Sequence, residues 1–266
     1  GLVAAIPAYE ECADYARLMG HPITGVKLSN ELKMDLDALQ AASRGAGLVF
    51  YCNPNNPVAT AINAADTRTY LATLMKQSPT TTVLVDEAYF EYATMPGYET
   101  MIPLAVENPR VVVARTFSKC FGMAGLRIGY AIAHKDTIAK MEAWESIDSI
   151  SIMALQGARA AMAVPASWVA AEQRRNAEAR AFTMKWFADR GYTPTDSQTN
   201  FMFVNIKRPS KGFREACARE GVLIGRDFPP YDTTHARISV GTLADMQRAV
   251  KVFEQVLATP AKAAAA

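Results

Sequence analysis

The segment Val111-Val112-Val113-Ala114-Arg115-Thr116-Phe117-Ser118-Lys119 joins an apolar, β-branched run to a loop rich in hydroxyl groups. The loop continues through two glycines, Gly122 and Gly125, and ends at Arg127. An apolar run of this kind predicts a buried strand. Lys119 then lies just beyond the end of that strand, where partial desolvation lowers the pKa of an amine and frees its lone pair.

A lysine in this position is typical of sites where an amine forms a Schiff base. The hydroxyls of Thr116 and Ser118, together with Arg127, can hold a phosphate close to Lys119. Pyridoxal 5′-phosphate needs both an imine-forming lysine and a phosphate site, so the loop favours this cofactor. Taken alone, the loop also fits a solvated surface lysine beside a serine.

Short β-branched runs alternate with helical patterns over the first two thirds of the chain. The expected strands are 2–6, 23–28, 47–52, 81–85, 110–114 and 128–133, and the expected helices include 11–19, 36–42 and 66–77. Asp66 is the expected N-cap of the third helix. This alternation predicts an α/β fold with a mainly parallel central sheet flanked by helices, whose ligand binds outside the carboxyl ends of the strands.

The pattern changes near residue 136 to one of long helices and fewer strands. Helices are expected over 137–145, 149–163, 168–190, 211–220 and 243–257, and strands over 200–206, 222–225 and 236–240. We therefore expect a large domain over 1–148, followed over 149–266 by an interdomain helix and a smaller C-terminal α+β domain. The low-complexity end, 258–266, is expected to fray.

Polar residues follow two further expected strands. Asp86 comes directly after an apolar strand, where a carboxylate can keep a pyridinium nitrogen protonated, and the hydroxyl of Tyr89 can reach the phenolic oxygen of the same ring. Asn56 belongs to the turn Asn53-Pro54-Asn55-Asn56-Pro57, whose amide can donate to an oxyanion. A helix N-cap with a packed tyrosine and a tight loop are the respective alternatives.

Three more side chains are candidates for binding. Tyr9 follows the first expected strand and can stack on a flat heterocycle or simply pack. Arg237 lies on the strand expected over 236–240, where a half-buried guanidinium needs an anion from a ligand or from an internal salt bridge. Arg226 is a second, weaker candidate, because the neighbouring Asp227 can neutralise it.

Composition argues against several classes of function. The chain has 266 residues, half of them apolar, and 28 basic against 26 acidic side chains, so neither nucleic acid nor a membrane surface is indicated as a partner. No apolar run approaches the roughly 20 residues that cross a bilayer. The four cysteines and three histidines lack ligand spacing, which predicts no metal site and favours reduced thiols in the cytoplasm. A Rossmann-type nucleotide-binding protein would need a glycine fingerprint that the sequence lacks.

The ordered motifs resemble the class I/II (fold type I) pyridoxal-phosphate aminotransferases, and most closely their histidinol-phosphate aminotransferase branch. The motifs are Asn-Pro-Asn-Asn-Pro at 53–57, Asp-Glu-Ala-Tyr at 86–89, Ser-Lys at 118–119 with Gly-Leu-Arg-x-Gly-Tyr at 125–130, and Arg-x-Ser-x-Gly at 237–241. The resemblance runs from Tyr9 to about Leu257. Four such motifs in the family's order and with compatible spacing are highly specific.

The resemblance implies a cofactor role for five residues near the ring. Lys119 would bind the cofactor covalently and then move a proton between Cα and C4′. Asp86 would pair with the pyridine nitrogen. Asn56 and Tyr89 would contact the phenolic oxygen, and Tyr9 would stack on the ring.

The resemblance also implies how anionic groups are bound. Thr116, Ser118 and Arg127 would hold the cofactor phosphate. Arg237 would bind the carboxylate of the substrate or its equivalent, and Arg226 matches a second substrate-anion contact more loosely.

The activity that the resemblance implies is amino transfer between an amino acid, or a phosphorylated amine, and 2-oxoglutarate. The partners would be a small-molecule amino donor and a 2-oxo acid, and the enzyme would be a cytoplasmic homodimer. A decarboxylase of a phosphorylated amino acid shares these motifs and is the alternative. A non-catalytic relative of the same fold is disfavoured, because Lys119 and Asp86 are both present. Arg237 does not distinguish histidinol phosphate from an aromatic, basic or dicarboxylic amino acid.

Two departures from the family pattern give further expectations. Asn56-Pro57-Val58-Ala59-Thr60 replaces the usual Asn-Pro-Thr-Gly, so we expect the turn to close without that glycine and a hydroxyl to be supplied one or two positions later. The family's amino-terminal arm, a dimer-contact tyrosine and a loop that gives backbone amides to the cofactor phosphate would all precede Tyr9. We therefore expect the large domain to be incomplete at its N-terminus and this polypeptide alone to bind the cofactor less firmly.

Overall fold

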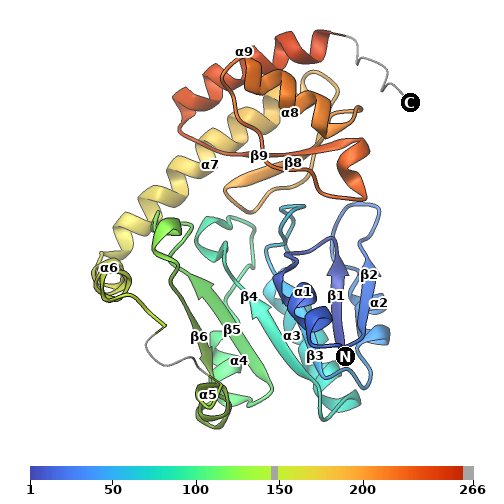
Figure 1. The fold of residues 1–266 in the computed structure, drawn as a ribbon, viewed down its shortest axis with the longest axis vertical. Helices are drawn as coiled ribbons and strands as arrows, with labels where there is room; N and C mark the ends of the chain where they lie inside the picture. The colour runs from blue at the N-terminus through green and yellow to red at the C-terminus, as the bar shows by residue number, and fades with distance from the viewer. Residues whose placement is uncertain (145–148, 260–266) are drawn as a thin grey trace.

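The computed structural model describes residues 1–144 and 149–259 and shows two parts joined by a long helix (Figure 1). The first part contains a six-stranded sheet of order β2-β1-β3-β4-β5-β6. Its strands are β1 (Leu2–Ile6), β2 (Ile23–Lys27), β3 (Leu48–Cys52), β4 (Thr82–Asp86), β5 (Val111–Thr116) and β6 (Gly129–Ala133). All neighbouring pairs are parallel except β5 with β6. The α/β fold with a mainly parallel sheet is therefore confirmed.

Helices cover both faces of this sheet. They are α1 (Glu11–Leu18), α2 (Leu36–Ala42), α3 (Ala64–Gln77), α4 (Ile102–Glu107) and α5 (Lys135–Glu142). Alternate strand residues such as Val49 and Val83 pack with Leu71 of α3 in the main core. The residues between them, such as Phe50, face the opposite side, where α1 packs. The apolar runs of the strands are thus explained by burial on two faces.

The second part is a small antiparallel sheet with helices on it. The helices and strands after α5 are α6 (Ile152–Met162), α7 (Ala166–Ala188), β7 (Thr193–Pro194), β8 (Phe201–Asn205), α8 (Ser210–Arg219), β9 (His235–Ser239) and α9 (Leu243–Ala258). The sheet order is β7-β8-β9, and Phe187, Phe213 and Phe253 of the three helices α7, α8 and α9 pack with Met202 of β8.

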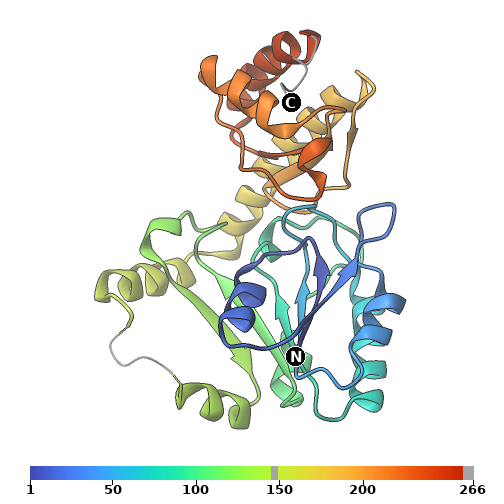
Figure 2. The same ribbon diagram turned by 45° about the vertical axis from the view of Figure 1, so that its right-hand side comes forward.

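The connection between the two parts is helical. Figures 1 and 2 show α7 rising from the large part to the small one. Ala154 and Ala158 of α6 pack with Phe117 and Ile128 of the large part. We propose 1–148 and 149–266 as the limits of the two domains, with α6 and the start of α7 as the connection.

Some local expectations are wrong. Helix α3 begins at Ala64, because the Oδ1 atom of Asn63 accepts the backbone N–H of Asp66 at 2.9 Å, so Asn63 and not Asp66 is the N-cap. The expected strand over 222–225 is a loop. Helix α4 and the two-residue strand β7 were not expected, and both are too short to give a periodic signal. Ala258 still belongs to α9, whereas Glu145 and 260–266 lie outside the described residues.

Among the described residues, no helix combines the length and apolar character that crossing a membrane requires.

A buried ion pair fixes the chain directly after β4. Glu87 is 2% exposed, and its Oε2 atom accepts hydrogen bonds from Nη2 of Arg115 at 2.8 Å and from the Thr100 hydroxyl at 2.8 Å. Its Oε1 atom accepts the backbone N–H of Met101 at 2.7 Å. The guanidinium of Arg115 also lies over the ring of Phe90. This network holds the loop that follows Asp86 against β5.

We expect Arg115→Ala to lower the free energy of unfolding by about 3–5 kcal/mol, because it leaves the Glu87 carboxylate buried without its counter-ion. Urea denaturation followed by circular dichroism measures the change. Arg68→Ala is the control, since its pair with Glu99 is about half exposed and should contribute less than about 1 kcal/mol. Equal losses in the two variants would contradict the structural role given to Arg115.

Candidate active site

The carboxyl ends of four parallel strands bring together residues that are far apart in the sequence. Tyr9 follows β1, Asn56 follows β3, Asp86 is the last residue of β4, and Thr116 is the last residue of β5 with Lys119 three positions beyond it. Strand β3 pairs with β4, and β4 with β5, so these ends lie side by side. The structure thus places the expected residues at the edge of the sheet where such folds bind ligands.

Lys119 is partly buried within this group. Its Nζ atom lies 5.2 Å from the centre of the Tyr89 ring. Burial lowers the pKa of its amine, and the positive charges of Arg237 and Arg127 lower it further, while Asp86 opposes the shift. A larger fraction of this amine is therefore neutral near pH 7 than of an ordinary lysine, as a Schiff-base nucleophile requires.

The pKa of the Asp86 carboxyl group is shifted in the opposite direction, and desolvation is again the main cause. Burial raises the pKa of its carboxyl group, and hydrogen bonds and the charge of Lys119 offset this only in part. Its Oδ1 atom accepts the backbone N–H of Ala88 at 3.0 Å, and its Oδ2 atom faces the thiol of Cys52 at 3.6 Å. A cationic partner stabilises the charged form of a desolvated carboxylate, and a protonated pyridine nitrogen is such a partner.

Asn56 and Arg237 join the two parts of the chain at the site. Nη1 of Arg237, on β9, donates to Oδ1 of Asn56 at 2.8 Å. Because a guanidinium only donates, this contact fixes which atom of the amide is the oxygen and leaves Nδ2 as a donor for another group. A free amide donor is what the predicted contact of Asn56 with a phenolic oxygen would require.

Arg237 also has binding capacity that the described residues do not use. Its guanidinium carbon lies 4.6 Å from the centre of the Phe201 ring and 5.0 Å from that of Phe228. Its Nε atom is buried and has no hydrogen-bond partner in the described part of the chain. Burial lowers the pKa of Arg237, which is the shift expected for a desolvated cation without a full counter-ion. The side chain fits an anionic ligand better than an internal salt bridge.

Tyr89 and Tyr9 form walls of the site. Tyr89 is 4% exposed, and its ring meets Phe201 edge to face with centroids 5.1 Å apart. Burial raises the pKa of its hydroxyl, and the positive charge of Arg237 opposes that shift. Tyr9 is 39% exposed, and burial followed by nearby carboxylates raises its pKa too. Both hydroxyls therefore stay protonated and can donate.

The hydroxyl-rich loop gathers the proposed phosphate ligands on one short segment. The backbone N–H of Ser118 donates to Oγ1 of Thr116 at 3.0 Å, so both residues share one turn. Arg127 ends the loop with a left-handed backbone (φ 52°), and its Nη1 atom donates to the carbonyl of Ala124 at 2.8 Å. Two hydroxyls and one guanidinium are a suitable set of donors for a phosphate, so the residues present fit the cofactor.

Arg226 is paired differently from what the sequence suggested. The alternative that Asp227 neutralises it is wrong, because Oδ2 of Asp227 accepts from Arg214 at 2.9 Å and Oδ1 accepts from Ser210 at 2.7 Å. Arg226 instead forms an ion pair with Glu10, next to Tyr9. Sequence reasoning missed Glu10, because nothing local connects it with a residue 216 positions away.

The turn after β3 closes without glycine, as expected. Ala59 takes the left-handed backbone (φ 67°), and its N–H donates to the carbonyl of Asn55 at 2.9 Å. The hydroxyl of Thr60 donates to the carbonyl of Leu32 at 2.7 Å. This hydroxyl, two positions after Val58, therefore binds the neighbouring loop.

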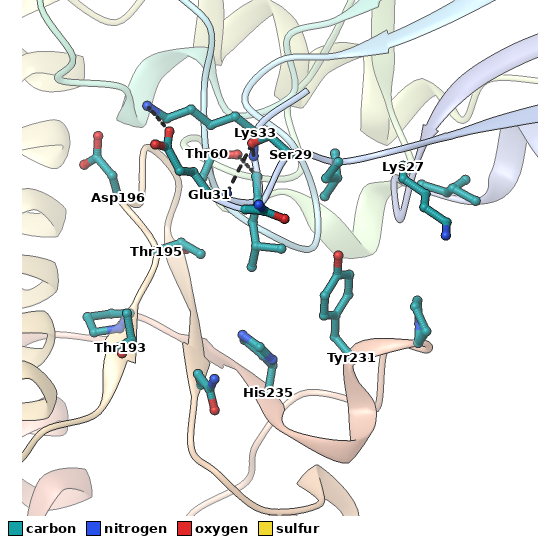
Figure 3. A pocket seen from close by; sticks show the side chains of 17 residues that line it. Lys27, Ser29, Glu31, Lys33, Thr60, Thr193, Thr195, Asp196, Tyr231 and His235 are labelled. Carbon is teal, nitrogen blue, oxygen red and sulfur yellow. Dashed lines mark hydrogen bonds and ion pairs between the residues drawn. The ribbon is translucent and has the colours of Figure 1, made fainter. Parts of the chain in front are cut away.

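Two hollows lie between the large and small parts. The larger, of about 810 Å³, is lined by residues such as Lys27, Lys33, Tyr231 and His235 (Figure 3), and none of the expected site residues lines it. The smaller, of about 300 Å³, is lined by Tyr9, Glu10, Arg226 and Phe228 together with residues of β1 and α1. The smaller hollow is thus the one that adjoins the candidate site.

Comparisons with known proteins agree with this geometry. Residues 1–253 match the family model described as aminotransferase class I and II. The histidinol-phosphate aminotransferase of Shouchella clausii is 31% identical over 97% of this chain and 70% of its own length. That of Symbiobacterium thermophilum is 33% identical over 96% of this chain and 69% of its own length. The chain thus spans about 70% of the length of these two relatives.

Solved structures similar to this chain also include histidinol-phosphate aminotransferases. A putative histidinol-phosphate aminotransferase from Erwinia carotovora atroseptica has a TM-score of 0.88 at 32% identity, over 95% of this chain and 73% of that one. The histidinol-phosphate aminotransferase from Sinorhizobium meliloti, solved with pyridoxal-5′-phosphate, has a TM-score of 0.86 at 26% identity, over 97% and 70%. The L-threonine-O-3-phosphate decarboxylase from Porphyromonas gingivalis has a TM-score of 0.80 at 23% identity, over 97% and 77%, and shows likeness of fold alone.

The pKa shift of Lys119 can be tested in the cofactor-free protein. We expect the pH midpoint for trace acetylation of Lys119, followed by mass spectrometry, to lie below that of the exposed Lys211, because burial and Arg237 disfavour the ammonium form. Arg237→Gln removes a neighbouring cation and should raise the midpoint. Asp86→Asn removes the opposing anion and should lower it. Equal midpoints for Lys119 and Lys211, or shifts of the opposite sign, would contradict the electrostatics described.

Proposed function

The chain belongs to the class I and II aminotransferases, which depend on pyridoxal 5′-phosphate, and from that premise we propose that it moves an amino group between a histidinol-phosphate-like amine and 2-oxoglutarate. One observation carries the proposal. Lys119 and Asp86 lie within electrostatic reach of each other at the strand ends, and Arg237 reaches Asn56 beside them from the small part. The family fixes the cofactor, and these residues supply the groups that its chemistry needs.

Five residues would hold the ring of the cofactor. Lys119 would attach to it, Asp86 would face its nitrogen, and Asn56 and Tyr89 would donate to its phenolic oxygen, while Tyr9 would lie on its face. When bound, the cofactor supplies an electron sink that stabilises negative charge at the substrate's Cα. Asp86 would help to keep a proton on the ring nitrogen, and its desolvation would strengthen that interaction.

Lys119 would also move the proton at the substrate's Cα. A general base works best when its pKa lies near the working pH, and burial shifts the pKa of Lys119 in that direction. The Nζ atom of Lys119 lies 5.2 Å from the centre of the Tyr89 ring, so the two residues proposed to contact the cofactor would act from the same part of the site.

The anionic groups would be divided between two sets of donors. Thr116, Ser118 and Arg127 would bind the cofactor phosphate. Arg237 would bind the substrate's carboxylate or its equivalent with donors that Asn56 does not use, and its unpartnered, buried Nε atom supports this role. Arg226 would add a second contact to an anionic substrate.

Exposed apolar side chains on α6 support the further proposal that the protein acts as a homodimer. Ile152, Met153 and Met162 are 64%, 70% and 75% exposed, which is unusual for large apolar side chains gathered on one helix. Four free cysteines support a cytoplasmic location. Analytical ultracentrifugation at micromolar concentration should give twice the mass of one chain, and a monomer at all concentrations would contradict the dimer.

The function is tested by loading the protein with pyridoxal 5′-phosphate. We expect a long-wavelength absorbance band from the covalent link to Lys119, and formation of glutamate when histidinol phosphate and 2-oxoglutarate are added. Lys119→Ala should lose the band and reduce turnover at least about 100-fold, because both the attachment and the proton transfer are removed.

Lys140→Ala, at an exposed position on α5, is the matched control and should keep both signals. Absence of the band in the unaltered protein would contradict the proposal. Release of carbon dioxide from a phosphorylated amino acid, without glutamate formation, would favour the decarboxylase instead.

A further inference from the structure

Glu10 and Arg226 link the two parts of the chain beside the candidate site. Glu10 lies between Tyr9 and the start of α1, whereas Arg226 lies in the loop between α8 and β9. The Oε1 atom of Glu10 accepts from Nη2 of Arg226. Both side chains line the hollow of about 300 Å³ and remain accessible, with exposures of 39% and 56%. A ligand in that hollow can therefore reach either of them.

A second arginine, Arg237, lies close to the one that pairs with Glu10. The guanidinium carbons of Arg226 and Arg237 lie 4.4 and 5.0 Å from the centre of the same ring, that of Phe228. The charge of Arg226 acts on Arg237 and lowers its pKa, although desolvation is the larger cause. Both guanidinium groups therefore lie against one aromatic side chain, that of Phe228.

The neighbouring charged groups do not cancel this excess of positive charge. Among the described residues, Glu10 forms an ion pair with Arg226, and no carboxylate forms an ion pair with Arg237. Asp227, although adjacent to Arg226 in sequence, is bound by Arg214 and Ser210. Asn56, the partner of Arg237, is neutral. The group formed by Glu10, Arg226 and Arg237 therefore contains two positive charges and one negative charge, so one positive charge is uncompensated.

We infer that Glu10 is a specificity-determining residue: its carboxylate occupies Arg226 when the site is empty, and an anionic group of the substrate must displace it. This inference rests on the proposed function, because it assigns the displaced contact to the amino donor. A phosphate monoester carries up to two negative charges and three acceptor oxygens, so it can satisfy Arg226 and Arg237 together. A single carboxylate has one charge and two acceptor oxygens, so it satisfies two arginines less completely, and a donor without a second anion leaves Glu10 in place.

Displacement has a consequence for selectivity. Binding of an anion to Arg226 is opposed by the loss of the Glu10 contact and by repulsion from the freed carboxylate. Glu10 therefore weakens the binding of all anions at this position, so an anion that replaces it must supply enough charge and acceptor oxygens to satisfy Arg226 in its place. Specificity of this kind depends on a repulsive group as much as on the attractive ones.

The inference is tested with inorganic phosphate as the probe and the protein loaded with pyridoxal 5′-phosphate, so that the donors at Thr116, Ser118 and Arg127 are already occupied. We expect Glu10→Gln to lower the phosphate dissociation constant roughly two- to fivefold in isothermal titration calorimetry, as befits an exposed charge. Glu11→Gln removes the same charge one residue away and should leave the constant unchanged. Arg226→Gln should weaken binding, and the double variant Glu10→Gln/Arg226→Gln should bind no more tightly than Arg226→Gln.

Steady-state kinetics distinguish displacement of Glu10 by the substrate from a purely structural role of the Glu10–Arg226 ion pair. Glu10→Gln should lower KM for the phosphorylated donor and leave kcat unchanged, whereas loss of a structural contact would lower kcat or raise KM. Equal phosphate affinities of Glu10→Gln and Glu11→Gln would overturn the inference even if amino transfer is observed. If the phosphate results hold but no amino transfer occurs, the counter-ion role of Glu10 stands and the proposed function fails.

Discussion

The parallel register of β3, β4 and β5 is the constraint on which the site depends. It sets Cys52 opposite Asp86 and Asp86 opposite Ala114, so that three strands end at one edge of the sheet. The loops leaving this edge carry the amide, the carboxylate and the amine. Directly behind Asp86, the buried pair of Glu87 and Arg115 ties the chain after β4 to β5. A shift of one residue in the register would turn Asp86 to the opposite face of the sheet.

Burial then shifts the pKa values of the acid and the base of the site in opposite directions. Asp86 and Lys119 are both desolvated, which raises the pKa of the carboxyl group and lowers that of the amine. Their mutual attraction opposes both shifts without cancelling either. The amine of Lys119 is therefore more easily deprotonated than that of an ordinary lysine. The carboxylate of Asp86 beside it is stabilised by a positively charged partner. This combination marks a functional site more clearly than either shift alone, because a simple buried salt bridge would stabilise both charges.

Local sequence signals predicted the strands, the loops after them and the residues that those loops carry. The signals failed where two local choices were equivalent, as with Asn63 and Asp66, since both residue types can cap a helix. They also failed at 222–225, where the apolar Val222 and Ile224 pack on the small core from a loop rather than from a strand. Contacts between the two parts had no local signal. Arg237 and Asn56 are 181 residues apart, and Asp227, the obvious neighbour for Arg226, is bound to α8 instead.

The contacts that Arg237 and Arg226 make with the large part differ in the charge of the acceptor, and the two arginines therefore have different roles. Asn56 accepts a hydrogen bond from Arg237 without neutralising it, so the full charge of Arg237 remains available to an anion. Glu10 cancels much of the charge of Arg226, so Arg226 becomes available only when Glu10 leaves. The charge of Arg237 is therefore always available to an anionic ligand, whereas that of Arg226 is available only after Glu10 has been displaced. Both guanidinium groups lie against Phe228, and under our proposal an anion bound by Arg237 would compete with Glu10 for Arg226.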